Sequence, residues 1–417
     1  MTESTPSFTV VIPTRERAET LVSTLRTVVD QNYDGLSIVV SDNDSRDATR
    51  EVVESFKDPR ITYINTGRRL SMSRNWEFAL AHVKRGFVTY VGDDDGLMPD
   101  ALTDAASLLT EGRVSALVWK KAQYVWPSSS MPGYPNLLLL PLDNKIFRCD
   151  AARVLRDCIR FWTPYFFLPS VYNAFVDFEV FKRIMSRSGA FFHSITPDAY
   201  SGFALAGGID EYLLMTRPLS VNGASGRSNG SSIERYLNTK SGDAEAARYL
   251  SEIDQPLHPK LPVAAIGSIV IPVLEALLQA NDRCFDGRLD VDIKQGFRRA
   301  MREVAKQSRT RYESVAAALR QIGRETGMVD VVEAAIRRYP NVPVQAAPPQ
   351  LGAIADVLTI DASTLGVADV AAAAKVGGAI LGPYVRPSVV RNYHHSAKFA
   401  SRALRLVQPR MKSWLWD

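Results

Sequence analysis

Two hydrophobic periods alternate along the first 120 residues of the chain. Largely apolar runs of strand length occupy residues 8–12, 37–40, 61–64, 87–91 and 116–119. Between them, apolar residues recur every three or four positions, as on one face of a helix, at residues 18–29, 45–56, 71–83 and 100–109. Strands separated by helices of this length predict an α/β fold with a mostly parallel sheet and helices on both faces. Such a sheet binds ligands at the carboxyl ends of its strands.

The chain is long enough for more than one domain. Its 417 residues are 46% apolar and 23% charged, which is close to the average for globular proteins. A loop rich in Pro and Ser at 127–147 leads into a second α/β portion, and helical periodicity dominates from residue 233 onward. We therefore expect an α/β domain over 1–232, with halves at 1–120 and 121–232, and a mainly helical domain over 233–417.

The N-terminus and the cysteines favour a cytoplasmic location. The first residues lack the basic segment and apolar run of an export signal. Cys149, Cys158 and Cys284 are scattered without C-x-x-C spacing, which fits a reducing compartment and argues against a cysteine zinc site. The apolar stretch 261–280 has the length of a membrane span, but it contains two prolines and Glu275, so we expect it to be buried in protein.

Basic residues are concentrated near the C-terminus. The net charge is +5, and residues 386–412 hold seven Lys or Arg and no Asp or Glu. Within the basic tail, 387–417, apolar residues recur at helical spacing from 387 to about 408, which predicts an amphipathic helix. This helix either docks on its own protein or binds anionic lipid peripherally at the inner face of the cell membrane. The tail lacks the interleaved aromatic residues of a nucleic-acid reader, so no nucleic-acid partner is expected.

Three consecutive carboxylates follow the strand at 87–91. Asp93, Asp94 and Asp95 come directly after Gly92, and their like charges repel unless a cation, hydrogen bonds or water relieve them. A solvated loop would explain the triplet, as would a divalent cation held at the strand end. The sequence around the triplet favours the second interpretation.

Four sequence blocks resemble family 2 glycosyltransferases of the GT-A fold. They are FTVVIPTRERAETL, IVVSDNDSRDATREVV, SMSRNWEFALAHV and YVGDDDGLMPDAL, in the order and spacing of that family. The resemblance covers about residues 7–230 and is strong to Leu109. It implies an inverting, metal-dependent transfer of a sugar from a nucleoside diphosphate sugar to a hydroxyl acceptor. A glycan or lipid-linked acceptor, in surface polysaccharide or glycolipid assembly, is the expected partner.

The resemblance also implies a Mn²⁺ or Mg²⁺ cofactor at the acidic triplet. The family usually has Asp-x-Asp-Asp here, and Gly92 stands where its first Asp would be. Asp93 and Asp95 still form an acid-x-acid pair, so we expect them to bind the metal, with Asp95 preferred. Asp94 remains an alternative metal ligand, and both Asp93 and Asp94 are expected to lie beside the donor.

The nucleotide site implied by the resemblance draws on three more blocks. Asp42, in SDNDS, matches a carboxylate that accepts a hydrogen bond from the base, although it could also cap a helix, a role for which Ser45 and Asp47 are better placed. The other matching positions are Pro13, Thr14, Arg15, Arg74 and Asn75. Arg74 could equally be a surface residue of its helix, and Arg17 is expected to be exposed.

Asp198 is the predicted catalytic base. It follows the triplet by about a hundred residues, where the family carries its catalytic Asp, and a carboxylate there would take the proton of the acceptor hydroxyl. Thr196-Pro197-Asp198 is also a good helix start, so Asp210 and Glu211 remain alternatives. Arg227, in the Gly-rich and Ser-rich loop 223–232, either contacts a phosphate or belongs to a flexible loop.

Two competing functions remain open. A sugar-nucleotide pyrophosphorylase shares the general fold but has a Gly-rich, basic signature after the first strand, where this chain has IPTRERAET. A catalytically inactive GT-A scaffold would keep the fold and lose the carboxylates that carry the chemistry. The sequence names neither the sugar, the base nor the acceptor, and it leaves homo-oligomerisation open.

Overall fold

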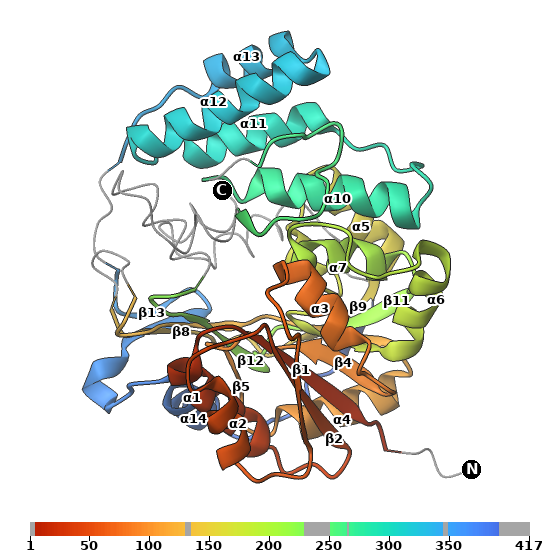
Figure 1. Cartoon of the computed structure of the whole chain (residues 1–417). Coiled ribbons are helices and arrows are strands. Elements are labelled where there is room, and N and C mark those ends of the chain that lie inside the picture. Colours follow the sequence, from red (N-terminus) through yellow and green to blue (C-terminus); the bar gives the residue numbers. More distant parts are fainter. Residues whose placement is uncertain (1–4, 130–134, 229–250, 265–266, 345–348, 392–417) are drawn as a thin grey trace.

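A computed structural model describes residues 5–129, 135–228, 251–264, 267–344 and 349–391 (Figure 1). Its main sheet has nine strands in the order β15-β9-β11-β6-β10-β4-β1-β2-β3. Their bounds are β1 (Phe8–Thr14), β2 (Leu36–Asp42), β3 (Ile61–Asn65), β4 (Phe87–Tyr90), β6 (Ala116–Trp119), β9 (Ile146–Asp150), β10 (Ala174–Asp177), β11 (Glu211–Met215) and β15 (Val389–Arg391). Strands β3, β2, β1 and β4 are parallel, whereas β10 is antiparallel to both of its neighbours, β4 and β6.

Helices cover both faces of this sheet, as predicted. The helices of the α/β part are α1 (Ala18–Val29), α2 (Thr49–Ser55), α3 (Met72–Leu80), α4 (Ala101–Gly112), α5 (Ala151–Ile159), α6 (Phe178–Ser188) and α7 (Pro197–Ala206), with a short 3₁₀ turn, η1 (Tyr165–Phe167). Side chains alternate between faces along β1: Val10 and Ile12 pack with α1 and α4, and Val11 packs on the side of α3 and α7. The predicted α/β fold class is therefore confirmed.

A second, six-stranded sheet lies beside the first, in the order β13-β14-β8-β7-β12-β5. Its strands are β5 (Gly96–Leu97), β7 (Ala122–Val125), β8 (Leu137–Pro141), β12 (Ser220–Ala224), β13 (Gly352–Ile354) and β14 (Val357–Asp361). Helix α14 (Val370–Leu381) follows the turn η2 (Ala362–Leu365) and packs against this sheet with Val370 and Ala374 buried. Because β5 begins one residue after Asp95, the acidic triplet connects the two sheets.

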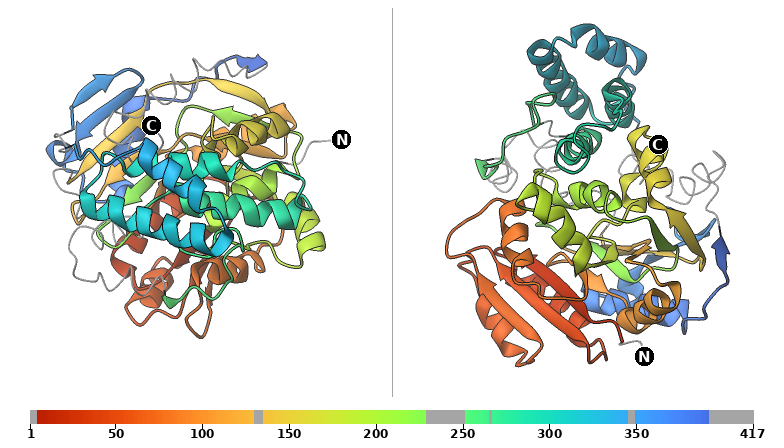
Figure 2. Two further views of the ribbon diagram at one scale, coloured as in Figure 1. Left: turned by 90° about the horizontal axis from the view of Figure 1, so that it is seen from above. Right: turned by 90° about the vertical axis from the view of Figure 1, so that its right-hand side faces the viewer.

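Of the helical part of the chain, the described residues include four helices. They are α10 (Val270–Cys284), α11 (Ile293–Val304), α12 (Arg309–Thr326) and α13 (Val329–Arg338), and they stack at one end of the molecule, above α7 (Figures 1 and 2). The apolar stretch predicted to be buried contributes α10, whose Leu274, Leu277 and Glu275 are inaccessible to solvent. Among the described residues, no helix has the length and hydrophobicity needed to cross a membrane.

The chain returns to the α/β part after α13. Strands β13 and β14 extend the second sheet through β8, and β15 pairs with β9 at the edge of the first. Residues 352–391 thus pack with the α/β domain, although the expected boundaries assigned them to the helical domain 233–417. Sequence periodicity missed this return because short edge strands carry too few residues to show a period. The predicted amphipathic helix of the tail lies almost wholly in 392–417, outside the described residues.

Candidate active site

The acidic triplet is buried. Asp93, Asp94 and Asp95 expose only 4%, 4% and 5% of their surface, which rules out a solvated loop. The three residues lie at the carboxyl end of β4, next to the ends of β1 and β2, as expected for a parallel sheet. Buried carboxylates need hydrogen-bond donors or cations, so the partners of each one indicate its role.

Asp93 is held by the loop after β1. Its Oδ2 accepts hydrogen bonds from Thr14 Oγ1 at 2.9 Å and from the backbone N–H of Arg15 at 3.4 Å. Its Oδ1 forms an ion pair of 2.8 Å with Nη1 of Arg17, whose side chain is 18% exposed. The expectation that Arg17 is simply exposed was therefore wrong. Its partner follows 76 residues later, so the local sequence gave no sign of the pair.

Asp94 and Asp95 accept hydrogen bonds from the end of β12 and from the residue that follows it. Asp94 Oδ2 accepts from Oγ and N of Ser225 at 2.6 and 3.3 Å, while its Oδ1 has no hydrogen-bond partner among the described residues. Asp95 instead bonds through both oxygens to backbone N–H groups, those of Gly223 at 2.6 Å and Gly92 at 3.1 Å. Burial raises the pKa of Asp94 to about 7 and also raises that of Asp95.

Close packing explains the glycine that stands in place of the family's first Asp. A Cβ atom at Gly92 would lie 2.2 Å from Oη of Tyr172 and 2.7 Å from Oδ2 of Asp95. No side chain fits there without displacing these groups. Gly223 is equally constrained, since a Cβ would lie 1.8 Å from the backbone oxygen of Asp94.

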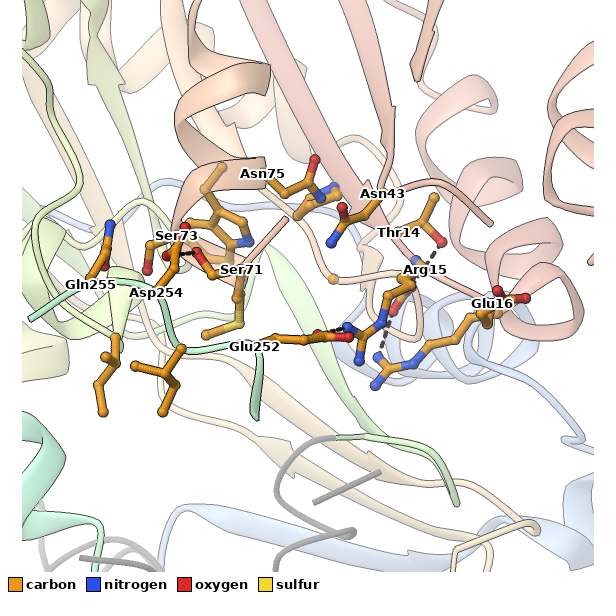
Figure 3. A pocket seen from close by; sticks show the side chains of 18 of the residues that line it. Thr14, Arg15, Glu16, Asn43, Ser71, Ser73, Asn75, Glu252, Asp254 and Gln255 are labelled. Carbon is orange, nitrogen blue, oxygen red and sulfur yellow. Dashed lines mark hydrogen bonds and ion pairs between the residues drawn. The ribbon is translucent and has the colours of Figure 1, made fainter. Parts of the chain in front are cut away.

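A pocket opens beside the triplet (Figure 3). Among the residues predicted to bind the donor, its walls contain Pro13, Thr14, Arg15, Asn75, Asp93 and Asp94. Asp95 is not among the lining residues, because its carboxylate points toward the backbone of Gly223 and Gly92. The pocket brings six predicted residues, drawn from three separate sequence blocks, into one site.

Asp42 does not itself line the pocket. It is 1% exposed, and its carboxylate accepts from Tyr63 Oη at 2.6 Å, Asn65 Nδ2 at 3.1 Å and the backbone N–H of Ser45 at 3.0 Å. The adjacent Asn43, which the sequence interpretation passed over, lines the pocket instead. Base recognition by Asp42 stays a prediction.

Two of the predicted arginines lie at the margin of the site. Arg74 is half-exposed, with Nε 3.8 Å from Asp254 Oδ2, and it does not line the pocket. Arg227 donates to the backbone oxygen of Glu16 at 2.9 Å, and its Nε lies 3.7 Å from Glu19. Residues 229–232 of the loop that carries Arg227 lie outside the described residues.

Asp198 occupies the first turn of α7, where Tyr165 donates a 2.8 Å hydrogen bond to its Oδ2. Lys121 connects it electrostatically with the triplet: burial lowers the pKa of Lys121, while the charges of Asp95 and Asp198 oppose that shift. Lys121 Nζ also lies 4.6 Å from the ring centre of Tyr172, a pocket residue. Asp198 therefore shares the electrostatic environment of the triplet.

The two alternative bases lie elsewhere. Asp210 and Glu211 are exposed at the amino end of β11, where Glu211 pairs with Arg148 at 3.2 Å. Strand β11 is parallel to β6, so this end lies at the edge of the sheet opposite the triplet. Their placement does not support a role at the pocket.

Comparison with known families agrees with this geometry. Residues 9–159 match the profile described as glycosyl transferase family 2. These residues form a family 2 glycosyltransferase domain. The match begins at the second residue of β1, includes the triplet and all of α4, and ends at the last residue of α5.

Two curated relatives resemble the glycosyltransferase domain in part. GalNAc(5)-diNAcBac-PP-undecaprenol beta-1,3-glucosyltransferase of Campylobacter jejuni is 32% identical over 110 residues, which cover 26% of this chain and 36% of the relative. Validoxylamine A glucosyltransferase of Streptomyces hygroscopicus is 41% identical over 86 residues, which cover 19% of this chain and 20% of the relative. The chain thus spans about a third or less of the length of these relatives.

Solved structures with distant resemblance were also found. TarS 1-349 of S. aureus in complex with UDP-GlcNAc is 14% identical with a TM-score of 0.45, covering 80% of this chain and 92% of that one. The mannosyltransferase PcManGT of Pyrobaculum calidifontis, in complex with GDP-Man and Mn²⁺, is 20% identical with a TM-score of 0.37, covering 81% and 88%.

Two carboxylates of the pocket, Asp93 and Asp94, could contribute to a site for a divalent cation. The described residues include no group of three or more His, Cys, Asp or Glu that could hold a metal by themselves. Asp93 and Asp94, however, are adjacent buried carboxylates facing the same pocket, and Asp94 Oδ1 has no hydrogen-bond partner among the described residues. This pair suits a hard cation that keeps water or phosphate oxygens as its other ligands.

Proposed function

We propose that this protein is an inverting glycosyltransferase that moves a sugar from a nucleoside diphosphate sugar to a hydroxyl acceptor. The observation that carries the proposal is one pocket of a family 2 domain that combines buried Asp93 and Asp94 with Arg15 and Arg17. A diphosphate leaving group carries negative charge, which guanidinium groups and carboxylate-bound cations stabilise.

The proposed reaction assigns the proton transfer to Asp198. The acceptor oxygen bonds to the anomeric carbon on the face opposite the diphosphate, and the bond from that carbon to the β-phosphate oxygen breaks. The electron pair leaves with the nucleoside diphosphate, and the hydroxyl proton passes to the Asp198 carboxylate. Tyr165 holds Oδ2 of Asp198, and Oδ1 has no hydrogen-bond partner among the described residues.

We assign the predicted Mn²⁺ or Mg²⁺ to Asp94 and Asp93 rather than to Asp95. Asp94 and Asp93 line the pocket and Asp95 does not, and Asp94 Oδ1 has no hydrogen-bond partner among the described residues. When bound, the cation would offset the charge that develops on the departing diphosphate. Arg17 forms an ion pair with Asp93, so its guanidinium group places a second positive charge beside the proposed cation.

The acceptor and the location are part of the proposal. The Campylobacter relative is named for a substrate carried on PP-undecaprenol. By analogy, we propose a lipid-linked or glycan acceptor in glycolipid or surface polysaccharide assembly, with the protein at the cytoplasmic face of the cell membrane. Peripheral binding through the basic tail 387–417 belongs to the same hypothesis and is tested separately by liposome sedimentation at low and high salt.

The decisive experiment is a screen of nucleoside diphosphate sugars for transfer and slow hydrolysis. UDP-, GDP- and dTDP-sugars are incubated with the full chain and Mn²⁺ or Mg²⁺, with chelator-treated samples alongside. Release of the nucleoside diphosphate from one of them supports the proposal. Consumption of pyrophosphate with formation of nucleoside triphosphate would indicate a pyrophosphorylase. A protein that binds no nucleoside diphosphate with either metal would be an inactive scaffold.

A further inference from the structure

A short acidic segment of the chain lies inside the donor pocket. Residues 252–255, with the sequence EIDQ, line it together with Arg15 and Ser71 (Figure 3). They belong to the part of the chain that precedes the helices at the end of the molecule, beyond the matched family domain. The segment therefore adds two carboxylates to a site whose proposed ligand is an anion.

Both carboxylates bind groups on the donor side of the pocket. Glu252 Oε2 forms an ion pair with Nη1 of Arg15, and Asp254 Oδ1 accepts a hydrogen bond of 2.6 Å from Oγ of Ser71. Asp254 Oδ2 also lies 3.8 Å from Nε of Arg74. Two of the three partners, Arg15 and Arg74, are residues that the sequence assigns to the nucleotide.

The segment is anchored behind the pocket and held more weakly inside it. Gln255, 9% exposed, donates to the backbone oxygen of Phe192 at 3.3 Å, and Gln279 donates to the backbone oxygen of Pro256 at 3.1 Å. In contrast, the side chains of Glu252 and Asp254 are 20% and 51% exposed. The half-exposed Asp254–Arg74 pair contributes little free energy, and the Glu252–Arg15 pair is in partial contact with solvent, so an incoming anion can replace these carboxylates.

The size of the pocket also indicates that a donor would have to displace the segment. With the segment in place, the cavity measures about 140 Å³. Sites for small molecules usually measure about 300–1,000 Å³, and a nucleoside diphosphate sugar is a large ligand of this kind. A guanidinium group binds carboxylate and phosphate oxygens with the same geometry, so the two anions are alternatives at Arg15.

We propose that Glu252 and Asp254 set the affinity of the donor site by occupying its anion-binding groups, from which the diphosphate of the donor displaces them. The inference rests on the proposed function, because the displacing ligand is taken to be a nucleoside diphosphate. Removing the two negative charges should tighten nucleotide binding, whereas removing groups that bind the nucleotide would weaken it.

The test is isothermal titration of the full chain with UDP, GDP and dTDP, each with MnCl₂. The double variant Glu252→Gln/Asp254→Asn keeps the side-chain shapes and removes both charges. Its Kd for the preferred nucleotide should fall about threefold to tenfold relative to the unaltered protein. The single variant Asp254→Asn, at a half-exposed position, should give part of the effect and keeps the test valid if the double variant is poorly folded.

A matched control separates a local effect from a change in net charge. Asp286→Asn/Glu313→Gln removes the same two charges at exposed positions, 82% and 60% exposed, that do not line the pocket. This control should bind nucleotide like the unaltered protein. Equal affinity of the unaltered protein, the double variant and the control would overturn the inference and leave the proposed function standing. Weaker binding by the double variant would also overturn it, because the carboxylates would then be ligands of the donor. Absence of nucleotide binding in every protein overturns the inference and the proposed function together.

Discussion

Tyr165 donates a hydrogen bond of 2.8 Å from its phenol to Oδ2 of Asp198. The two residues are 33 positions apart, one in the turn η1 and the other in the first turn of α7. Burial raises the pKa of Tyr165, and the negative charge of Asp198 raises it further, so the phenol stays protonated and remains a donor. The hydrogen bond therefore fixes the orientation of the carboxylate that is the proposed general base.

Tyr165→Phe should therefore lower turnover. Loss of the donor leaves the Asp198 carboxylate without the hydrogen bond that orients it, so kcat should fall about fivefold to tenfold. The Kd for the nucleotide should stay the same. Tyr212→Phe is the matched control, since Tyr212 donates at 2.6 Å to the backbone oxygen of Phe167 in the same turn without touching Asp198. An equal fall in kcat in both variants would mean that loosening of the turn, not the lost donor, is responsible.

Asp198→Asn should lower turnover about 10²–10⁴-fold while leaving donor affinity nearly unchanged. The amide keeps the shape of the side chain but cannot accept the proton. Initial rates with saturating donor, together with calorimetric Kd values, separate these two effects. Near-normal turnover would remove Asp198 from the mechanism. A large fall in melting temperature would instead identify it as a helix-start residue.

Asp94→Asn should stabilise the metal-free protein above neutral pH. The pKa of Asp94 is about 7 in the folded state and about 3.9 in an unfolded chain, so ionisation disfavours the folded state. The stability associated with the protonated form is complete below about pH 4 and is lost as the pH rises through 7. The variant should melt above the unaltered protein at pH 8, and the difference should shrink toward pH 5. Scanning calorimetry with chelator present measures both.

Asp286→Asn serves as the reference for this measurement because Asp286 is an exposed acid on the surface. Its melting temperature should follow that of the unaltered protein at both pH values. If Asp94→Asn behaves in the same way, the negative charge of Asp94 has no unfavourable effect on the folded state. If it is more stable but inactive, the site sacrifices stability for function.

Gly92→Ala should destabilise the fold by about 1–3 kcal/mol, because the new Cβ would lie 2.2 Å from Oη of Tyr172. Tyr172→Phe removes that oxygen, so the double variant should lose less stability than the sum of the two single changes. Gly202→Ala is a suitable control. Gly202 lies in α7, and a Cβ atom there would make only ordinary contacts, of 3.5 Å or more, with neighbouring residues. Additive losses in the double-mutant cycle would show that this contact does not explain the glycine.

The sequence could predict where the site residues lie more readily than whether they are buried and which groups they pair with. Alternating periods located β1, β2 and β4, and parallel strands necessarily bring Thr14 and Asp93 to one edge. Burial of Asp93 and its pairing with Arg17 depend on chain segments 76 residues apart, which no local pattern encodes. For the same reason, nothing in the sequence around Glu252 indicated that it contacts Arg15, 237 residues earlier.

Pairing between β8 and β14 also constrains synthesis on the ribosome. Strand β8 presents four consecutive leucines, Leu137–Leu140, and its partner β14 begins at Val357, 220 residues later. At about 5–20 residues per second, β8 emerges roughly 10–40 s before β14 exists. For that interval a strongly apolar strand has one unpaired edge, which is the condition under which nascent chains associate with one another. From the slow completion of the second sheet, we expect the nascent chain to bind chaperones that shield unpaired strands.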